Sequence, residues 1–130
     1  MKIGLFTYVH LDEQELLDFN LVYHYIKYYI KHGIFSKNIT IIPYGYLNFE
    51  KNYEKFKDIC TYYNVPIYPI ENFPYDFMTA HNKFLEWQKI NGIKFDWLLK
   101  TDIDEFISYG YYTLYEYIHF LSKNEFDCGV

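Results

Sequence analysis

The stretch that decides the fold is Trp97-Leu98-Leu99-Lys100-Thr101-Asp102-Ile103-Asp104-Glu105-Phe106-Ile107. An apolar run over residues 95–99 begins just before this stretch and includes its first three residues. The run is short and rich in aromatic and branched side chains, which predicts a buried strand. Three carboxylates, those of Asp102, Asp104 and Glu105, follow where this strand should leave the sheet. Like charges this close repel each other unless a positive charge lies among them. The segment therefore predicts that the chain leaves the strand at a point where either a bound cation or solvent must offset the repulsion among the carboxylates.

Two interpretations of this acidic exit are open. Carboxylate oxygens suit Mg²⁺ or Mn²⁺, and open α/β sheets bind ligands at the carboxyl ends of their strands. The sharper interpretation is therefore a divalent metal site that holds a diphosphate. The plainer one is a solvated strand exit in which Asp102 caps a turn. Taken alone, an Asp-x-Asp pattern favours the plainer interpretation, because clustered carboxylates mark functional sites only statistically.

Composition restricts the classes of function that are open. The chain has 130 residues, of which 51% are hydrophobic and 24% aromatic. That is enough for one domain with a real core, and disorder is not expected. The net charge of −5 argues against a general nucleic-acid binder. All 12 basic residues are Lys, so a bound phosphate has to rely on Lys, backbone N–H groups or a metal rather than on bidentate Arg.

Cysteine usage and the N-terminal segment indicate where the protein resides. Cys60 and Cys128 have neither metal-ligand spacing nor the pattern of a disulfide framework. The apolar run over residues 3–9 is soon followed by Asp12 and Glu13. It is too short for most signal peptides and far too short to span a membrane. We therefore expect a soluble, cytoplasmic protein without a membrane span.

Hydrophobic periodicity predicts strands and helices in alternation. Strands are expected over residues 3–9, 38–44, 65–70, 95–99, 106–109 and from 126 onward, and helices over about 12–32, 47–63, 76–91 and 113–123. Alternation of this kind implies an α/β fold with a mainly parallel sheet and helices on both faces. The chain stops inside an apolar run, so we expect a single domain over residues 1–130 that is interrupted at its end.

Local signals place several helix ends. Asp12 with Glu15, and Thr113 with Glu116, have the spacing of a capping box at the start of a helix. Gly33 follows the first long periodic segment, and glycine at this place favours the left-handed conformation that ends a helix.

Three elements of the sequence share a wider pattern. The first element is Asp12-Glu13 after the first strand, followed by a long helix that contains Tyr23-His24 and is closed by His32-Gly33-Ile34. The second element, on the helix before the acidic strand, is Thr79-Ala80-His81-Asn82-Lys83. The third element, at the end of that strand, is Asp102-Ile103-Asp104-Glu105-Phe106. Together they resemble the nucleotide-sugar-binding half of a GT-A-fold glycosyltransferase of the family 2 or family 92 type. The likeness covers nearly all of this chain but only the first half of such an enzyme. It therefore implies that the C-terminal acceptor half is absent.

The resemblance implies a function and a set of residues. The expected activity is transfer of a sugar from a nucleotide-diphosphate sugar, first of all a UDP-sugar, to a hydroxyl acceptor with Mn²⁺ or Mg²⁺. Asp104 would bind the metal, and Asp102 would share it or contact the ribose. The remaining expected nucleotide contacts are Thr7, Tyr8, Val9, Glu13 and Asn82. In the family the general base comes from the C-terminal half, so the resemblance assigns no catalytic base to these 130 residues.

Each of these assignments has a plainer alternative. The residues around the end of the first strand fit an ordinary strand end, with Glu13 favourable at a helix N-terminus. Lys83 fits a solvated helix surface better than a ligand contact, and His81 fits a surface histidine with a hydrogen-bond partner better than a polar group that lines the site. Glu105 would support the metal ligands or pair with Lys100. One departure also puts the donor nucleotide in question: the family usually places an Asp after the second strand, where this chain has Pro43-Tyr44-Gly45-Tyr46.

Other function classes fit less well. A haloacid-dehalogenase-type phosphatase would carry Thr where Phe106 stands and would place its motif in the first strand. An EF-hand loop would need further ligands and a Gly after the second Asp, and the glycines nowhere form a Walker loop. The alternative that stays open is a truncated, non-catalytic nucleotide-sugar-binding or assembly module, whose many Tyr would offer an aromatic surface to a partner.

Overall fold

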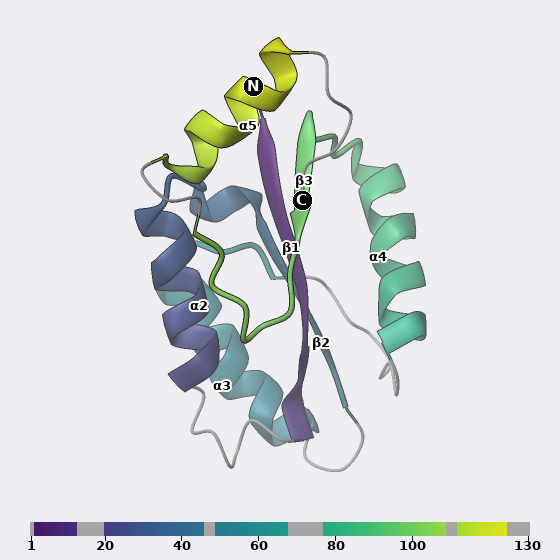
Figure 1. The fold of residues 1–130 in the computed structure, drawn as a ribbon. Helices are drawn as coiled ribbons and strands as arrows, with labels where there is room; N and C mark the ends of the chain where they lie inside the picture. Colours follow the sequence, from purple (N-terminus) through teal and green to yellow (C-terminus); the bar gives the residue numbers. More distant parts are fainter. Residues whose placement is uncertain (1, 13–19, 46–48, 68–76, 109–111, 125–130) are drawn as a thin grey trace.

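Strands and helices are interspersed along the sequence, and the described residues place two helices, α3 and α4, in succession between the second and third strands (Figure 1). The computed structural model describes residues 2–12, 20–45, 49–67, 77–108 and 112–124. The elements in chain order are β1 (Ile3–His10), α2 (Asn20–Lys31), the 3₁₀ turn η1 (Ser36–Asn38), β2 (Ile39–Tyr44), α3 (Phe49–Tyr62), α4 (Phe77–Asn91), β3 (Trp97–Lys100) and α5 (Leu114–Lys123).

The described strands form one parallel sheet in the order β2-β1-β3. β1 is central: Leu5 is level with Ile39 of β2, and Ile3 is level with Trp97 of β3. The pairing with β2 continues to His10, whereas the pairing with β3 ends at Phe6. The α/β class and the parallel sheet are thus as predicted. The early end of β3 means that the acidic segment leaves the sheet beside the middle of β1.

Helices cover both faces of the sheet, as predicted. Figure 1 shows α2 and α3 on one side of the strands and α4 on the other. Alternate residues of β1 serve the two sides because side chains of a strand point to opposite faces in turn. The larger core joins β1 and β2 to α2, α3 and α5 and includes Leu5, Val9, Ile26, Phe56 and Ile118. The smaller core, under α4, joins Phe6, Ile42 and Phe84, with Tyr8, Tyr44 and Trp87 packed against it.

Several helix ends follow the local signals. Gly33 has φ 98° and ends α2, and Gly92 has φ 62° and ends α4. At the start of α5, the backbone N–H of Glu116 donates to Oγ1 of Thr113 over 3.1 Å, which confirms this N-cap. The other N-cap prediction is wrong, because Asp12 is itself helical together with Leu11. Its partner Glu15 lies outside the described residues.

Two predicted strands are wrong where they can be compared with the structure. Residues 65–67 are not a strand: the N–H of Val65 donates to Cys60 O over 2.8 Å and so closes α3 instead of joining a ladder. Residues 106–108 are not a strand either, because both backbone groups of Ile107 bind tyrosine hydroxyls of α2. The remainder of both segments, and the strand expected from residue 126, lie outside the described residues.

Two further features bear on the sequence predictions. Cys60 is fully buried in the larger core, as expected of a small core residue, and burial raises the pKa of its thiol to about 12. Among the described residues, no helix is long and apolar enough to cross a membrane.

Candidate functional site

The acidic segment begins at Thr101, which is fixed to both the sheet and α2. Its N–H donates to Phe6 O over 3.2 Å, and its carbonyl accepts from the hydroxyl of Thr7 over 2.7 Å. Its own Oγ1 lies 2.5 Å from the hydroxyl of Tyr25. Thr7, Tyr25 and Thr101 are all buried. Buried hydroxyls require partners, so this trio holds the chain at one point as it leaves β3.

Asp102 to Glu105 then form a closed turn. The N–H of Glu105 donates to Asp102 O over 3.0 Å, and the N–H of Asp102 donates to Oε1 of Glu105 over 2.7 Å. One carboxylate oxygen of Glu105 is therefore used inside the turn, and Glu105 is not paired with Lys100 as one alternative proposed. The side chains of Asp102 and Asp104 are exposed. The turn thus offers two carboxylates to a ligand and uses the third to keep its shape.

Tyrosines of α2 hold the segment after the turn. The hydroxyl of Tyr29 donates to Glu105 O over 2.8 Å and accepts from the N–H of Ile107 over 3.2 Å. The hydroxyl of Tyr28 donates to Ile107 O over 2.7 Å. The ring of Phe106 packs edge-on to Tyr28, with 5.2 Å between the ring centroids. An irregular segment needs partners for its backbone polar groups, and here α2 supplies them.

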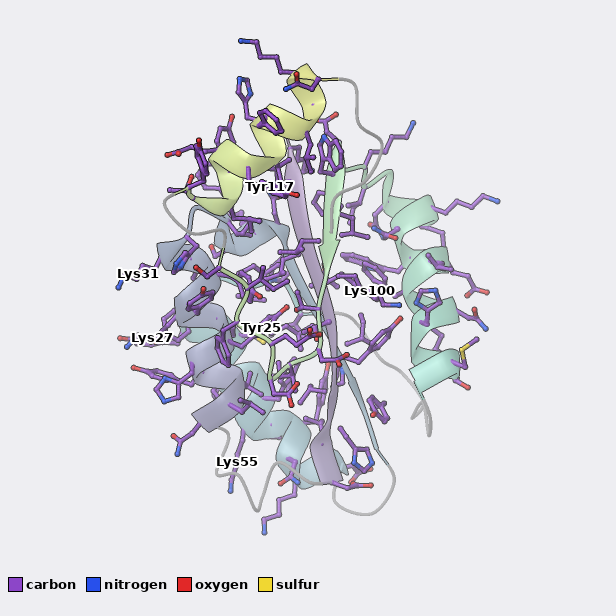
Figure 2. All side chains as sticks on the ribbon, in the orientation of Figure 1. Tyr25, Lys27, Lys31, Lys55, Lys100 and Tyr117 are labelled. Carbon is purple, nitrogen blue, oxygen red and sulfur yellow. The ribbon has the colours of Figure 1, made fainter. Side chains whose placement is uncertain are left out.

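Tyr25 is the innermost of these tyrosines. Figure 2 shows it between α2 and the strands. Burial, the largest cause, raises the pKa of its hydroxyl, and the hydrogen bond to Thr101 opposes that shift. Tyr25 is therefore a neutral hydrogen-bonding group of the core.

The residues expected at the end of β1 divide between the two faces of the sheet. Thr7 and Val9 point into the larger core, where they are 0% and 1% exposed, so their side chains are closed to a ligand. Tyr8 points to the opposite face and is half-buried. Glu13 lies outside the described residues.

Tyr8 is the centre of a polar cluster under α4. Its hydroxyl is hydrogen-bonded to Nδ1 of His81, and burial raises the pKa of this hydroxyl. The ammonium of Lys100 lies 5.7 Å from the centroid of the Tyr8 ring, within the range of a cation–π contact. His81 is half-buried and has the hydroxyl of Tyr8 as its hydrogen-bond partner, whereas Asn82 and Lys83 are exposed on α4.

The sequence analysis missed two aromatic residues at the carboxyl ends of β1 and β2. The ring of His10 lies 4.9 Å from that of Tyr44, and Nε2 of His10 lies 3.6 Å from Oδ2 of Asp12. His10 and Tyr44 are level with each other in the sheet register. The signal that could have found them is the parallel pairing, which brings the last residues of both strands to one edge.

The donor set decides what kind of metal site could form. In the described part of the chain, no group of three or more His, Cys, Asp or Glu side chains could hold a metal ion. Asp102 and Asp104 alone cannot enclose a cation. Mg²⁺ is commonly bound by one or two carboxylates together with substrate phosphates and water. The two exposed carboxylates fit a cation shared with a phosphate ligand, and do not fit a closed structural site.

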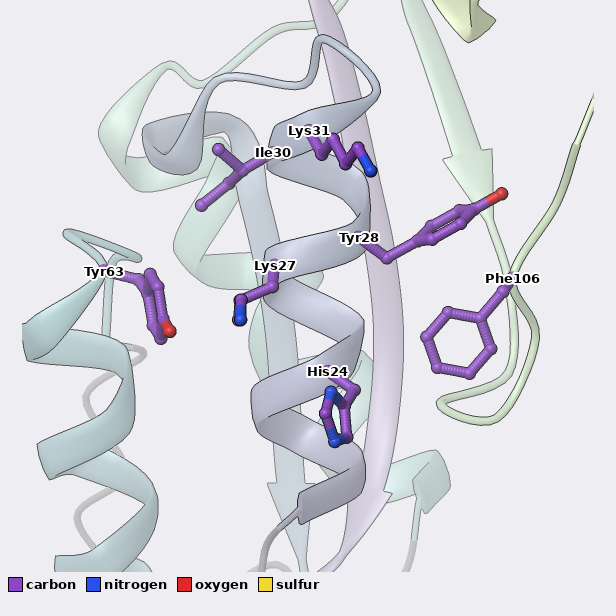
Figure 3. A pocket seen from close by; sticks show the side chains of 7 residues that line it. All are labelled: His24, Lys27, Tyr28, Ile30, Lys31, Tyr63 and Phe106. Carbon is purple, nitrogen blue, oxygen red and sulfur yellow. The ribbon is translucent and has the colours of Figure 1, made fainter.

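A separate hollow lies over the outer side of α2 (Figure 3). Its volume is about 670 Å³, and its walls are Tyr63, which directly follows α3, and Phe106 of the acidic segment. Figure 2 shows Lys27 and Lys31 pointing away from the sheet on this helix. The other residues that line the hollow are His24, Tyr28 and Ile30.

Comparison with known proteins adds no assignment: no family model, no curated protein and no solved structure matches this chain.

Proposed function

We propose that this chain is the nucleotide-sugar-binding part of a metal-dependent glycosyltransferase. Its ligand is a nucleotide-diphosphate sugar, first of all a UDP-sugar, and the sugar passes to a hydroxyl acceptor. The observation that carries the proposal is the turn at residues 102–105. It lies at the carboxyl end of β3, beside the central strand, and it exposes Asp102 and Asp104 while Glu105 closes it.

The position of the turn supports a phosphate ligand. Open parallel sheets bind ligands beyond the carboxyl ends of their strands, where helices and loops leave room. β1, β2 and β3 are parallel, so their carboxyl ends point in the same direction, with β3 ending beside the middle of β1. The carboxylates of Asp102 and Asp104 repel the diphosphate unless a cation lies between them, which is why the proposal includes Mn²⁺ or Mg²⁺.

The chain's own residues have distinct parts in this proposal. Asp102 and Asp104 would hold the cation, which would supply Lewis-acid stabilisation of the charge on the departing nucleoside diphosphate. Tyr8, held by His81, presents a ring and a neutral hydroxyl beside the strand ends. Lys100 adds positive charge at the same place. The proposal assigns none of the described residues as the general base that deprotonates the acceptor hydroxyl.

Calorimetry tests this proposal. UDP and GDP are titrated into the purified chain with Mn²⁺ and with EDTA, and then into Asp104→Ala and Asp102→Ala. Asp58→Ala is the matched control, because Asp58 is an exposed carboxylate of α3. We expect binding of one nucleotide that requires Mn²⁺, is lost in Asp104→Ala and is kept in Asp58→Ala. Nucleotide binding that is equal with Mn²⁺ and EDTA, or none at all, contradicts the proposal.

The hollow over α2 favours a second candidate function, that of an assembly module. Its floor carries Lys27 and Lys31, and its walls are aromatic, in a chain of net charge −5. It is open, so a small ligand would stay largely solvated, and charge complementarity points to an acidic peptide segment with an apolar anchor.

Selection of peptides from a random display library tests this second candidate. The expected peptides are acidic and aromatic, and they should fail to bind Lys27→Glu/Lys31→Glu while binding Lys51→Glu/Lys55→Glu on α3. Failure to select any peptide, or selection of neutral or basic ones, refutes it.

A further inference from the structure

Tyr25, Tyr28 and Tyr29 all direct their hydroxyls to one segment of the chain. The spacing of three and four residues places Tyr25 beside Tyr28 and Tyr29 on the helix. Their partners are Thr101 Oγ1, Ile107 O, Glu105 O and the N–H of Ile107, which lie on both sides of the acidic turn. One helix thus holds the turn at its start and at its end.

Packing alone does not require these hydroxyls. Phenylalanine would fill the same space, and a core residue gains nothing from a hydroxyl unless a partner is supplied. Residues 105–107 belong to no strand, so without α2 their backbone groups would have water as partner and the segment could take many shapes. The tyrosines therefore select one shape for residues 102–107.

We infer that Tyr28 and Tyr29 are positioning residues for the proposed metal site, because they bind the backbone at the end of the turn whose exposed carboxylates, Asp102 and Asp104, would share the cation. The inference rests on the proposed function and adds a role for α2 that the acidic motif does not contain. Tyr29 makes two of the bonds and Tyr28 makes one, so the effect of Tyr29 is the larger. Tyr25 acts chiefly on stability, because it is fully buried and binds the start of the segment.

The variants Tyr29→Phe and Tyr28→Phe test this role, with Tyr53→Phe as the control. Tyr53 lies on α3 and packs against the same core. All variants are studied well below their melting temperatures, so that loss of folded protein does not enter. The first readout is hydrogen exchange of the backbone amides of residues 102–107 without ligand. The second is UDP affinity with Mn²⁺ and with EDTA.

We expect faster exchange at residues 102–107 in Tyr29→Phe, and a fall of about tenfold in UDP affinity with Mn²⁺, the size expected for lost hydrogen bonds at a site. No UDP binding is expected in EDTA for the wild type or for any variant, and Tyr28→Phe should show a smaller loss of affinity with Mn²⁺ than Tyr29→Phe. A purely structural role would lower the melting temperature and leave the UDP affinity with Mn²⁺ as in Tyr53→Phe.

The outcomes separate this inference from the proposed function. If the wild-type chain shows no Mn²⁺-dependent binding, the proposed function fails and no metal site exists for the tyrosines to position. If the wild type binds but Tyr29→Phe keeps both the exchange rates and the metal-dependent affinity, the inference fails and the proposed function stands.

Discussion

Replacement of Tyr25 by Phe should destabilise the fold, because it removes the hydrogen-bond partner of the buried Thr101 hydroxyl. Tyr25 is 0% exposed, and its hydroxyl lies 2.5 Å from Oγ1 of Thr101, which is itself buried. Removing the hydroxyl leaves a buried polar atom without this partner, which costs about 1–3 kcal/mol. For a domain of this length each kcal/mol lowers the melting temperature by about 4 °C. We therefore expect a loss of about 2 kcal/mol and about 8 °C.

A double-mutant cycle makes this reasoning refutable. Thr101→Val removes the other hydroxyl at nearly constant shape, and replacing both partners of a buried bond is far cheaper than replacing one. Urea unfolding should show that Tyr25→Phe/Thr101→Val loses less than the sum of the single variants, by about 1 kcal/mol or more. Strictly additive losses, or a loss below about 0.5 kcal/mol in Tyr25→Phe, would refute the proposed bond.

Two further predictions concern the core. In Gly4→Ala the new Cβ would lie 2.7 Å from ring atoms of Phe95, so we expect urea unfolding to show a free energy of unfolding lower by about 1–3 kcal/mol. The second substitution Phe95→Leu should restore most of this free energy. A loss that Phe95→Leu leaves unchanged would contradict the prediction. The pKa of Cys60 is raised to about 12, so its contribution to stability is complete below about pH 9, the ordinary thiol range, and is lost as the pH rises from there to about 12. Over this range the unfolding free energy of the wild type should therefore fall by up to about 1.4 kcal/mol per pH unit more than that of Cys60→Ala. Parallel pH profiles of the two proteins would show that the thiol is not buried.

Local sequence signals predicted the sheet strands well because each is a short apolar run between turn residues. The period-2 alternation of β1 also contains the information that Thr7 and Val9 face the larger core, whereas Tyr8 points to the opposite face of the sheet, under α4. We used the closeness of all three to the strand end, which is why Thr7 and Val9 were expected at the nucleotide. The position of a residue along a strand indicates how near it lies to a site at the strand end. The face of the sheet to which its side chain points decides whether the side chain can reach that site.

The hydrogen bonds around the acidic turn could not be predicted in the same way. Tyr28 and Tyr29 lie more than 70 residues from their partners in residues 105–107, and no local pattern joins them. Hydrophobic periodicity treats these tyrosines as core residues, which describes their rings and omits their hydroxyls. The strand expected at residues 106–109 was wrong for the same reason, because side-chain hydroxyls took the backbone groups that a ladder would have used.

The measurement that tests the proposed metal site most directly is paramagnetic broadening by Mn²⁺. Mn²⁺ is added in small amounts to the ¹⁵N-labelled chain saturated with UDP, and the loss of each amide signal is followed. We expect the amides of Asp102, Asp104 and their neighbours in the turn to broaden first, and the effect to disappear in Asp104→Ala. Broadening centred elsewhere, or none at these amides, would show that this turn does not hold the metal and would contradict the proposed function.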